Sequence, residues 1–180
     1  MSSTAPAVLV CLDLQRARLS DAVSHASATR AADVCRQVLD QARARRWPVV
    51  HVHRREASPQ DARPIQGLEP LPSEPVYLHS GPSAFSSGAF AQFILAMGGP
   101  LALIGFSLSD SVLATAFAAV DRQLPVEILQ DAVAADARDE QGLRQAMAAS
   151  LKSLSPLCRI IDSPDFFQED AMAFAAANAP

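Results

Sequence analysis

Several polar side chains of this sequence could do chemistry, and each lies at or just after the end of a short apolar run. Ligands of parallel sheets bind at such positions, outside the carboxyl ends of the strands. The candidates are Asp13, Gln15, His51, His53, His79, the segment Ser107–Ser111 and Asp131. Each also has an ordinary structural interpretation, since a carboxylate after a strand often caps a helix or binds a loop amide. For Asp131, a cap is the better interpretation.

The pair His51 and His53 raises the question of a metal site. Val52 separates the two histidines, so in a strand they would share one face. A His-x-His pair needs a third and a fourth ligand to hold a metal. No further ligand stands at a recognisable spacing, so we expect hydrogen-bonded histidines, no metal and no other cofactor.

The elements that must position these residues alternate regularly between strand and helix. Short apolar runs predict strands at 7–12, 48–53, 76–78, 101–104, 126–129 and 158–161. Helical periodicity predicts helices at 29–46, 88–97, 109–122, 139–151 and 166–176, and the proline-rich segment 54–74 is expected to be a surface loop. The alternation predicts a parallel sheet with helices on both faces, in a single domain of residues 1–180.

Composition excludes several classes of function. The net charge is −4 and no long basic run occurs, so nucleic acid is not an expected partner. The N-terminus lacks a basic region and its apolar run is short, which predicts a cytoplasmic protein that does not span a membrane. Three widely spaced cysteines in apolar contexts are expected to be buried, reduced thiols. A nucleotide-binding domain is disfavoured because no GxGxxG follows the first strand.

Four segments, in order, resemble the isochorismatase-like (cysteine hydrolase) family. LVCLDLQ resembles its opening strand with Asp-x-Gln, and YLHSGPSAF resembles the segment in which the family carries a Lys before Ser-Ala-Phe. GFSLSDSVLATA resembles the family turn that carries a Cys, and LQDAV resembles its Asp-Ala after the fifth strand. The resemblance implies a Rossmann-like three-layer α/β/α sandwich with a six-stranded, mainly parallel sheet, and a homo-oligomer.

The family's amidases are described by an Asp, a Lys and a Cys. The resemblance assigns Asp13, His79 and Ser111 to these places, so two of the three residues are changed. No realignment restores them, because the sole Lys is Lys152 and no Cys lies between residues 35 and 158. The family also often has a cis peptide in this turn, which would fall around Ser107–Leu108. The resemblance further suggests four substrate-binding residues: Gln15, Phe85, Ser107 and Leu108.

Three interpretations of the altered residues stay open. Ser111 could be a nucleophile if Asp13 or His79 lies within hydrogen-bond reach as its base, although a short His could reach only one of the other two. Asp13 could instead protonate a vinyl ether if its pKa were raised. The protein could also be a catalytically silent member that binds a ligand or acts as a scaffold. The leading prediction is a hydrolase-like protein that acts on or binds a small amide, carbamoyl or vinyl-ether compound.

Two arginines after the first strand bear on the charge of that compound. Arg16 and Arg18 replace the acidic and aromatic segment that usually follows the first strand in the family. They could suit an anionic substrate, because the guanidinium group binds carboxylates well. Solvated side chains on a loop are the alternative interpretation.

Overall fold

A computed structural model describes residues 6, 8–21, 25–134 and 140–177. Both ends of the predicted domain of residues 1–180, and residue 139 of a predicted helix, lie outside the described residues. The strands are Val8–Leu12 (β1), Val49–Arg54 (β2), Val76–His79 (β3), Leu101–Phe106 (β4), Val126–Ala134 (β5) and Cys158–Ile161 (β6). The helices are Arg16–Asp21 (α1), His25–Ala44 (α2), Gly88–Met97 (α3), Leu113–Val120 (α4), Glu140–Lys152 (α5) and Ser163–Ala177 (α6).

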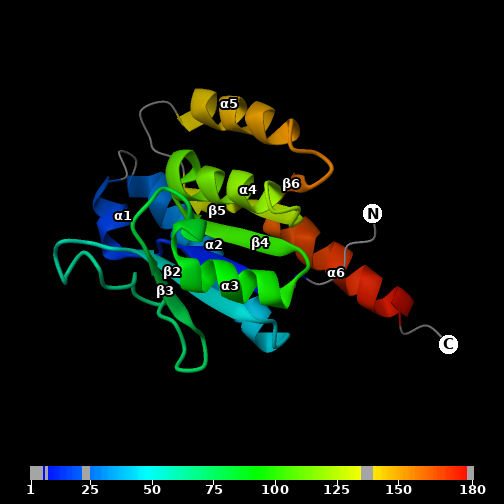
Figure 1. Cartoon of the computed structure of the whole chain (residues 1–180), viewed down its shortest axis with the longest axis horizontal. Helices are drawn as coiled ribbons and strands as arrows, with labels where there is room; N and C mark the ends of the chain where they lie inside the picture. Colours follow the sequence, from blue (N-terminus) through cyan, green and yellow to red (C-terminus); the bar gives the residue numbers. More distant parts are fainter. Residues whose placement is uncertain (1–5, 7, 22–24, 135–139, 178–180) are drawn as a thin grey trace.

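The six strands form one sheet in the order β3-β2-β1-β4-β5-β6. All the described strand pairings are parallel. Figure 1 shows α3 and α4 in front of this sheet and α2 behind it, which confirms the expected three-layer α/β/α sandwich. The order of strands reverses between β1 and β4, and ligands of such sheets bind at that point, outside the carboxyl ends.

The central strand β1 contributes to both hydrophobic layers. All five of its residues are buried, because helices cover both faces of the sheet. Val8, Val10 and Leu12 belong to the core cluster that includes residues of α3, α4 and α5. Leu9 and Cys11 belong to the opposite cluster, which includes residues of α2 and α6. Because side chains alternate between the two faces of the sheet, each residue of β1 packs against only one of the two hydrophobic layers.

A glycine allows the carboxyl ends of β1 and β4 to approach closely. Gly105 pairs with Leu12 in the parallel register and has a φ angle of +125°. A Cβ atom at this position would lie 2.0 Å from the carbonyl oxygen of Leu12. Only glycine fits such a position, since it has no Cβ and tolerates positive φ. The close approach brings Asp13, after β1, next to the turn that follows β4.

The structure differs from the sequence expectations mainly at the ends of elements. Strands β4 and β5 run on to Phe106 and Ala134, beyond their predicted ends at 104 and 129. The predicted helix 109–122 begins as a π-helical turn, Leu108–Val112, before it continues as α4. Helix α1 and a short 3₁₀ turn at Ala84–Ser86 were not predicted. Both are too short for helical periodicity to reveal them.

Candidate active site

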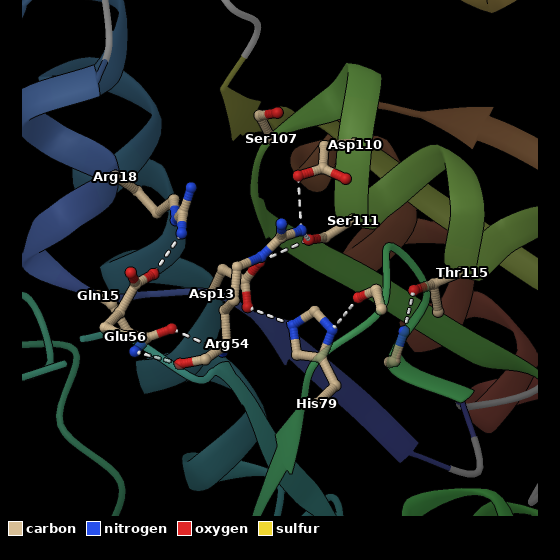
Figure 2. A network of polar contacts seen from close by, with 12 residues as sticks. Asp13, Gln15, Arg18, Arg54, Glu56, His79, Ser107, Asp110, Ser111 and Thr115 are labelled. Carbon is tan, nitrogen blue, oxygen red and sulfur yellow. Dashed lines mark hydrogen bonds and ion pairs between the residues drawn. The ribbon is translucent and has the colours of Figure 1, made fainter. Parts of the chain in front are cut away.

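Four strand ends supply the polar side chains of the candidate site (Figure 2). Asp13 follows β1, Arg54 ends β2, His79 ends β3, and Ser111 lies in the π-helical turn after β4. Since the strands are parallel, these ends meet at one edge of the sheet, on both sides of the switch between β1 and β4. The sequence-predicted trio of Asp13, His79 and Ser111 is brought together there, and Arg54 joins it.

Asp13 is the centre of the hydrogen-bond network. It is 1% exposed and adopts a φ angle of +48°, a conformation that Asp tolerates better than most residues. Its Oδ2 accepts a hydrogen bond from the Ser111 hydroxyl at 2.5 Å, and its Oδ1 lies 2.8 Å from Nε2 of His79. Burial would raise the pKa of Asp13, but hydrogen bonds from His79 and Ser111, with the nearby charges of His79 and Arg54, hold it below its usual value.

His79 faces an acceptor at each ring nitrogen. Its Nδ1 lies 2.7 Å from the carbonyl oxygen of Gly81, which can only accept, so Nδ1 carries a proton. Its Nε2 faces the carboxylate of Asp13. His79 therefore links the carboxylate of Asp13 to the loop that follows β3, with its ring between two acceptors.

The contacts of Ser111 decide between the two predicted bases. Among the described contacts, the Ser111 hydroxyl donates to Asp13, while His79 contacts Asp13 and not Ser111. The network therefore runs from serine to aspartate to histidine, and differs from the serine–histidine–aspartate order of serine proteases. The expectation that a short His could reach only one of the other two residues is confirmed.

Arg54 is the site residue that sequence reasoning missed. Its Nη2 donates to Ser111 Oγ at 3.0 Å and to Asp110 Oδ2 at 2.5 Å, and its Nε lies 3.5 Å from Asp13 Oδ2. Figure 2 shows the guanidinium between Asp13 on one side and Asp110 with Ser111 on the other. The sequence feature that could have identified Arg54 is its position, because it directly follows the apolar-rich run VVHVH at a strand end.

Gln15 fixes the backbone of Arg54. Its side-chain amide donates to the Arg54 carbonyl oxygen at 2.9 Å and accepts from the Arg54 N–H at 2.7 Å. Gln15 is 1% exposed, so this pairing is buried. The predicted substrate-binding residue Gln15 therefore holds the β2 end against the segment after β1, and positions Arg54.

The other predicted substrate-binding residues lie around the site at different depths. Phe85 is buried, packs edge-on against Phe90, and lies under the Arg122 guanidinium at 4.7 Å. Leu108 is buried and lines an apolar hollow with residues of β5, β6 and α5. Ser107 Oγ lies 3.4 Å from Ser109 Oγ. The cis peptide expected around Ser107–Leu108 is present one residue earlier, between Phe106 and Ser107.

Asp131 and His51 have structural partners, whereas Nε2 of the buried His53 has none, so the expectation that both histidines are hydrogen-bonded is wrong for His53. Asp131 accepts hydrogen bonds from the backbone N–H and the hydroxyl of Ser163, so it caps the start of α6 as the sequence suggested. His51 lies 3.1 Å from Glu74, and burial lowers its pKa despite that carboxylate. Among the described residues no group of three or more His, Cys, Asp or Glu side chains is placed to hold a metal.

The two arginines after β1 differ in their surroundings. Arg18 forms a partly buried ion pair with Glu56, which Figure 2 shows beside the site. Arg16 is exposed and donates to the carbonyl oxygen of Pro64 at 3.3 Å. The three cysteines are free and buried, as expected. Among the described helices, none is long and apolar enough to cross a membrane.

Comparison with known proteins identifies the family. The isochorismatase domain model matches residues 7–161, which covers the whole sheet and every residue of the site. The chain belongs to the isochorismatase family. A search of curated protein sequences found no match. The isochorismatase-family fold is thereby established, while the substrate, the cytoplasmic location and self-association stay predictions.

Solved structures of isochorismatase-family proteins share this fold over most of their length. An isochorismatase from Pseudomonas putida KT2440 is 23% identical, with a TM-score of 0.78 over 90% of this chain and 92% of that one. A family protein from Chromobacterium violaceum is 26% identical, with a TM-score of 0.74 over 92% and 93%. N-carbamoylsarcosine amidase from Thermoplasma acidophilum is 19% identical, with a TM-score of 0.70 over 87% and 95%.

Proposed function

We propose that this chain is an isochorismatase-family hydrolase that acts on a small amide or carbamoyl compound through Ser111, with Asp13 as the proton acceptor. One observation carries the proposal: Asp13 binds the Ser111 hydroxyl with one carboxylate oxygen and faces His79 with the other. The order Ser111, Asp13 and His79 in this network corresponds to the Cys, Asp and Lys of the family's amidases. The chemistry of a hydroxyl nucleophile requires a base in direct contact, and Asp13 fulfils that role.

The reaction would proceed through an acyl-enzyme. Ser111 Oγ attacks the carbonyl carbon while its proton passes to Asp13 Oδ2, and negative charge develops on the carbonyl oxygen. The C–N bond then breaks, and the leaving amine takes the proton from Asp13. Water hydrolyses the resulting ester, with its proton passing to Asp13 and from there to Ser111 Oγ. His79 and Arg54 balance the charge of the carboxylate between these transfers.

The same contacts imply a slow reaction. The pKa of Asp13 is held below its usual value, so the carboxylate is a weak base. A serine hydroxyl is also less acidic than the thiol at this position in the family's amidases. A low pKa equally counts against Asp13 as the acid that protonates a vinyl ether, because that role needs a raised pKa.

A catalytically silent binding protein is the second candidate. It is favoured by one observation: Ser111 is 0% exposed, and the Arg54–Asp110 ion pair lies against it. A substrate must displace part of this cover before it reaches Oγ. In a silent member, the same network would hold the strand ends together and bind a ligand without turnover.

The deciding experiment measures turnover of a panel of small amides, carbamoyl compounds and isochorismate. We expect the wild type to turn over at least one compound, and Ser111→Ala and Asp13→Asn each to lower kcat by at least about 100-fold, the usual scale for acid–base and nucleophile losses. Ser109→Ala, in the same turn, is the matched control and should retain activity. An acylating or phosphonylating probe should label Ser111 in the wild type.

The outcome for a silent member is different. The wild type would be inactive on the whole panel and unlabelled by the probe, while the double variant Ser111→Cys with His79→Lys would hydrolyse an amide. Such a result would show that the pocket still admits a substrate but that the wild-type residues do not catalyse its hydrolysis. Turnover that persists in Ser111→Ala would exclude Ser111 as the nucleophile.

A further inference from the structure

The guanidinium of Arg54 has donor capacity that the protein does not use. Its Nη2 makes both of its hydrogen bonds, to Asp110 and Ser111. Its Nε is buried and has no hydrogen-bond partner, although Asp13 lies 3.5 Å away. Arginine normally binds a carboxylate with two parallel N–H groups. Here a single nitrogen holds the carboxylate of Asp110. The fork of Arg54, meaning its parallel N–H groups, is therefore only partly occupied.

Asp110 is a replaceable partner for Arg54. Its side chain is 38% exposed, and only its Oδ2 contacts the guanidinium. The carboxylate of Asp110 reaches solvent, so water can replace Arg54 as its partner when the ion pair opens. Asp110 also precedes Ser111 directly, so rotation of its side chain into solvent would open the approach to Ser111 Oγ without movement of a strand. Arg54, in contrast, is fixed at its backbone by Gln15.

We infer that Asp110 is an internal substitute for a ligand carboxylate, and that the site takes small compounds with a carboxylate close to the carbonyl that Ser111 attacks. The ligand carboxylate displaces Asp110, binds the fork of Arg54, and leaves its carbonyl beside Ser111 Oγ. The spacing follows from the 3.0 Å between Arg54 Nη2 and Ser111 Oγ, which requires the two groups of the ligand to be neighbours. This inference rests on the proposed function for the reaction, but the binding step is independent of turnover.

Charge balance explains why Asp110 must leave. The Arg54 guanidinium already lies beside two carboxylates, Asp13 and Asp110. A further anion on Arg54 would be repelled while Asp110 stays in place. Neutralising Asp110 removes the carboxylate that competes with the ligand for Arg54, so anionic ligands should bind more tightly. The affinity for a neutral ligand should not change.

The test is calorimetric titration with oxamate, which carries a carboxylate next to an amide, and with oxamide, its neutral counterpart. We expect oxamate to bind the wild type at least tenfold more tightly than oxamide. Asp110→Asn should tighten oxamate binding at least fivefold and leave oxamide unchanged. Arg54→Gln should weaken oxamate binding at least tenfold, and Arg54→Lys should fall between because it keeps the charge but loses the fork.

Asp121→Asn is the matched control, since it removes an exposed carboxylate outside the site, at the end of α4. It should change neither affinity by more than twofold. Equal affinities for oxamate and oxamide, or oxamate binding by Asp110→Asn no tighter than by the wild type, would overturn the inference. Ammonia release separates the two proposals: oxamate binding without turnover of any compound refutes the hydrolase alone, and turnover of neutral amides without preference for oxamate refutes the anion site alone.

Discussion

At the scale of single residues, Asp13 is a buried carboxylate whose charge is balanced from three sides. A buried charge is costly unless it is paired and hydrogen-bonded, and His79, Ser111 and Arg54 supply those partners. A lysine ammonium has three rotatable donors and could contact both the carboxylate and the nucleophile. His79 has two ring nitrogens in fixed directions, and one of them contacts Gly81. The exchange of Lys for His therefore leaves the nucleophile without a cation, and Arg54 supplies it from the neighbouring strand.

His53 makes a pH-dependent contribution that can be measured. It is 6% exposed, its Nε2 has no hydrogen-bond partner, and burial together with the charge of His51 lowers its pKa to about 4. Between about pH 6.5 and pH 4 the unfolded chain binds a proton at this residue that the folded chain does not. Stability therefore falls as the pH falls through that window, by about 2 kcal/mol between pH 7.5 and pH 5.

Urea unfolding at pH 7.5 and at pH 5.0 tests this contribution. The wild type should lose about 2 kcal/mol more than His53→Leu between the two pH values, because leucine does not titrate. Val52→Ala, a buried change at the adjacent position, should lower stability at both pH values but keep the pH dependence of the wild type. Equal losses in the wild type and His53→Leu would show that His53 is not the group responsible.

The sequence predicted that Asp13, His79 and Ser111 lie near one another, because polar residues that follow the strands of a parallel sheet gather at one edge, and the structure brings them together. It did not identify Arg54, because a long side chain can turn toward solvent or toward the site. The choice depends on tertiary partners, Gln15 at the backbone and Asp110 at the guanidinium, which lie 39 and 56 residues away. The sequence also suggested Phe85 as a substrate contact. It could not show that this ring packs against Phe90, because that contact depends on where α3 lies.

At the scale of elements, the site depends on how closely β1 and β4 approach at their carboxyl ends. Gly105 makes that approach possible, so its replacement should disturb both the fold and the site. Gly105→Ala should lower the free energy of unfolding by at least about 2–3 kcal/mol, because it combines a forbidden φ with a Cβ atom 2.0 Å from a backbone oxygen. Chemical denaturation of both proteins at neutral pH measures the difference.

Gly88→Ala is the control for the glycine variant. Gly88 is the first residue of α3, and a Cβ atom there meets nothing within 4 Å. Alanine at this position should leave stability unchanged or raise it by up to about 1 kcal/mol, since it reduces the freedom of the unfolded chain. A Gly105→Ala protein as stable as Gly88→Ala would contradict the proposed role of the close approach.

Strands and long helices were predictable because their apolar patterns extend over enough residues to fix a period. Helix α2 has buried positions at Ala31, Cys35, Val38 and Ala42, the same face that the sequence periodicity predicted. The π-helical turn before α4 was not predictable. Residues 108–112 continue the polar-to-apolar pattern of an ordinary helix start, and the wider turn becomes apparent only from its backbone hydrogen bonds, such as that from Val112 N–H to the Ser107 carbonyl oxygen.

At the scale of the whole molecule, the sheet separates two hydrophobic layers, one on each of its faces. One layer contains Trp47, which packs against Phe166 and Phe167 of α6 with ring centroids 5.7 and 5.4 Å away. The other contains Tyr77, which packs against Phe90 and Phe93 of α3 at 5.9 and 5.8 Å. These are the sole tryptophan and the sole tyrosine of the chain, so each layer has its own reporter.

Because every strand of the sheet takes part in the core, a substitution that destabilises one layer should also destabilise the other. Phe166 is 0% exposed, and Phe166→Ala should lower stability by about 3–5 kcal/mol through the cavity it leaves. Unfolding in urea can be followed by Trp47 fluorescence and by ¹⁹F NMR of fluorotyrosine at position 77. Both probes should give one midpoint in the wild type, and both should shift together in the variant, as for a single cooperative domain.

Met172→Ala, at a position on α6 that is 65% exposed, should shift neither midpoint appreciably. If only the Trp47 midpoint moves in Phe166→Ala, the layers unfold independently, and the strand ends that carry Asp13, His79 and Ser111 do not depend on α6.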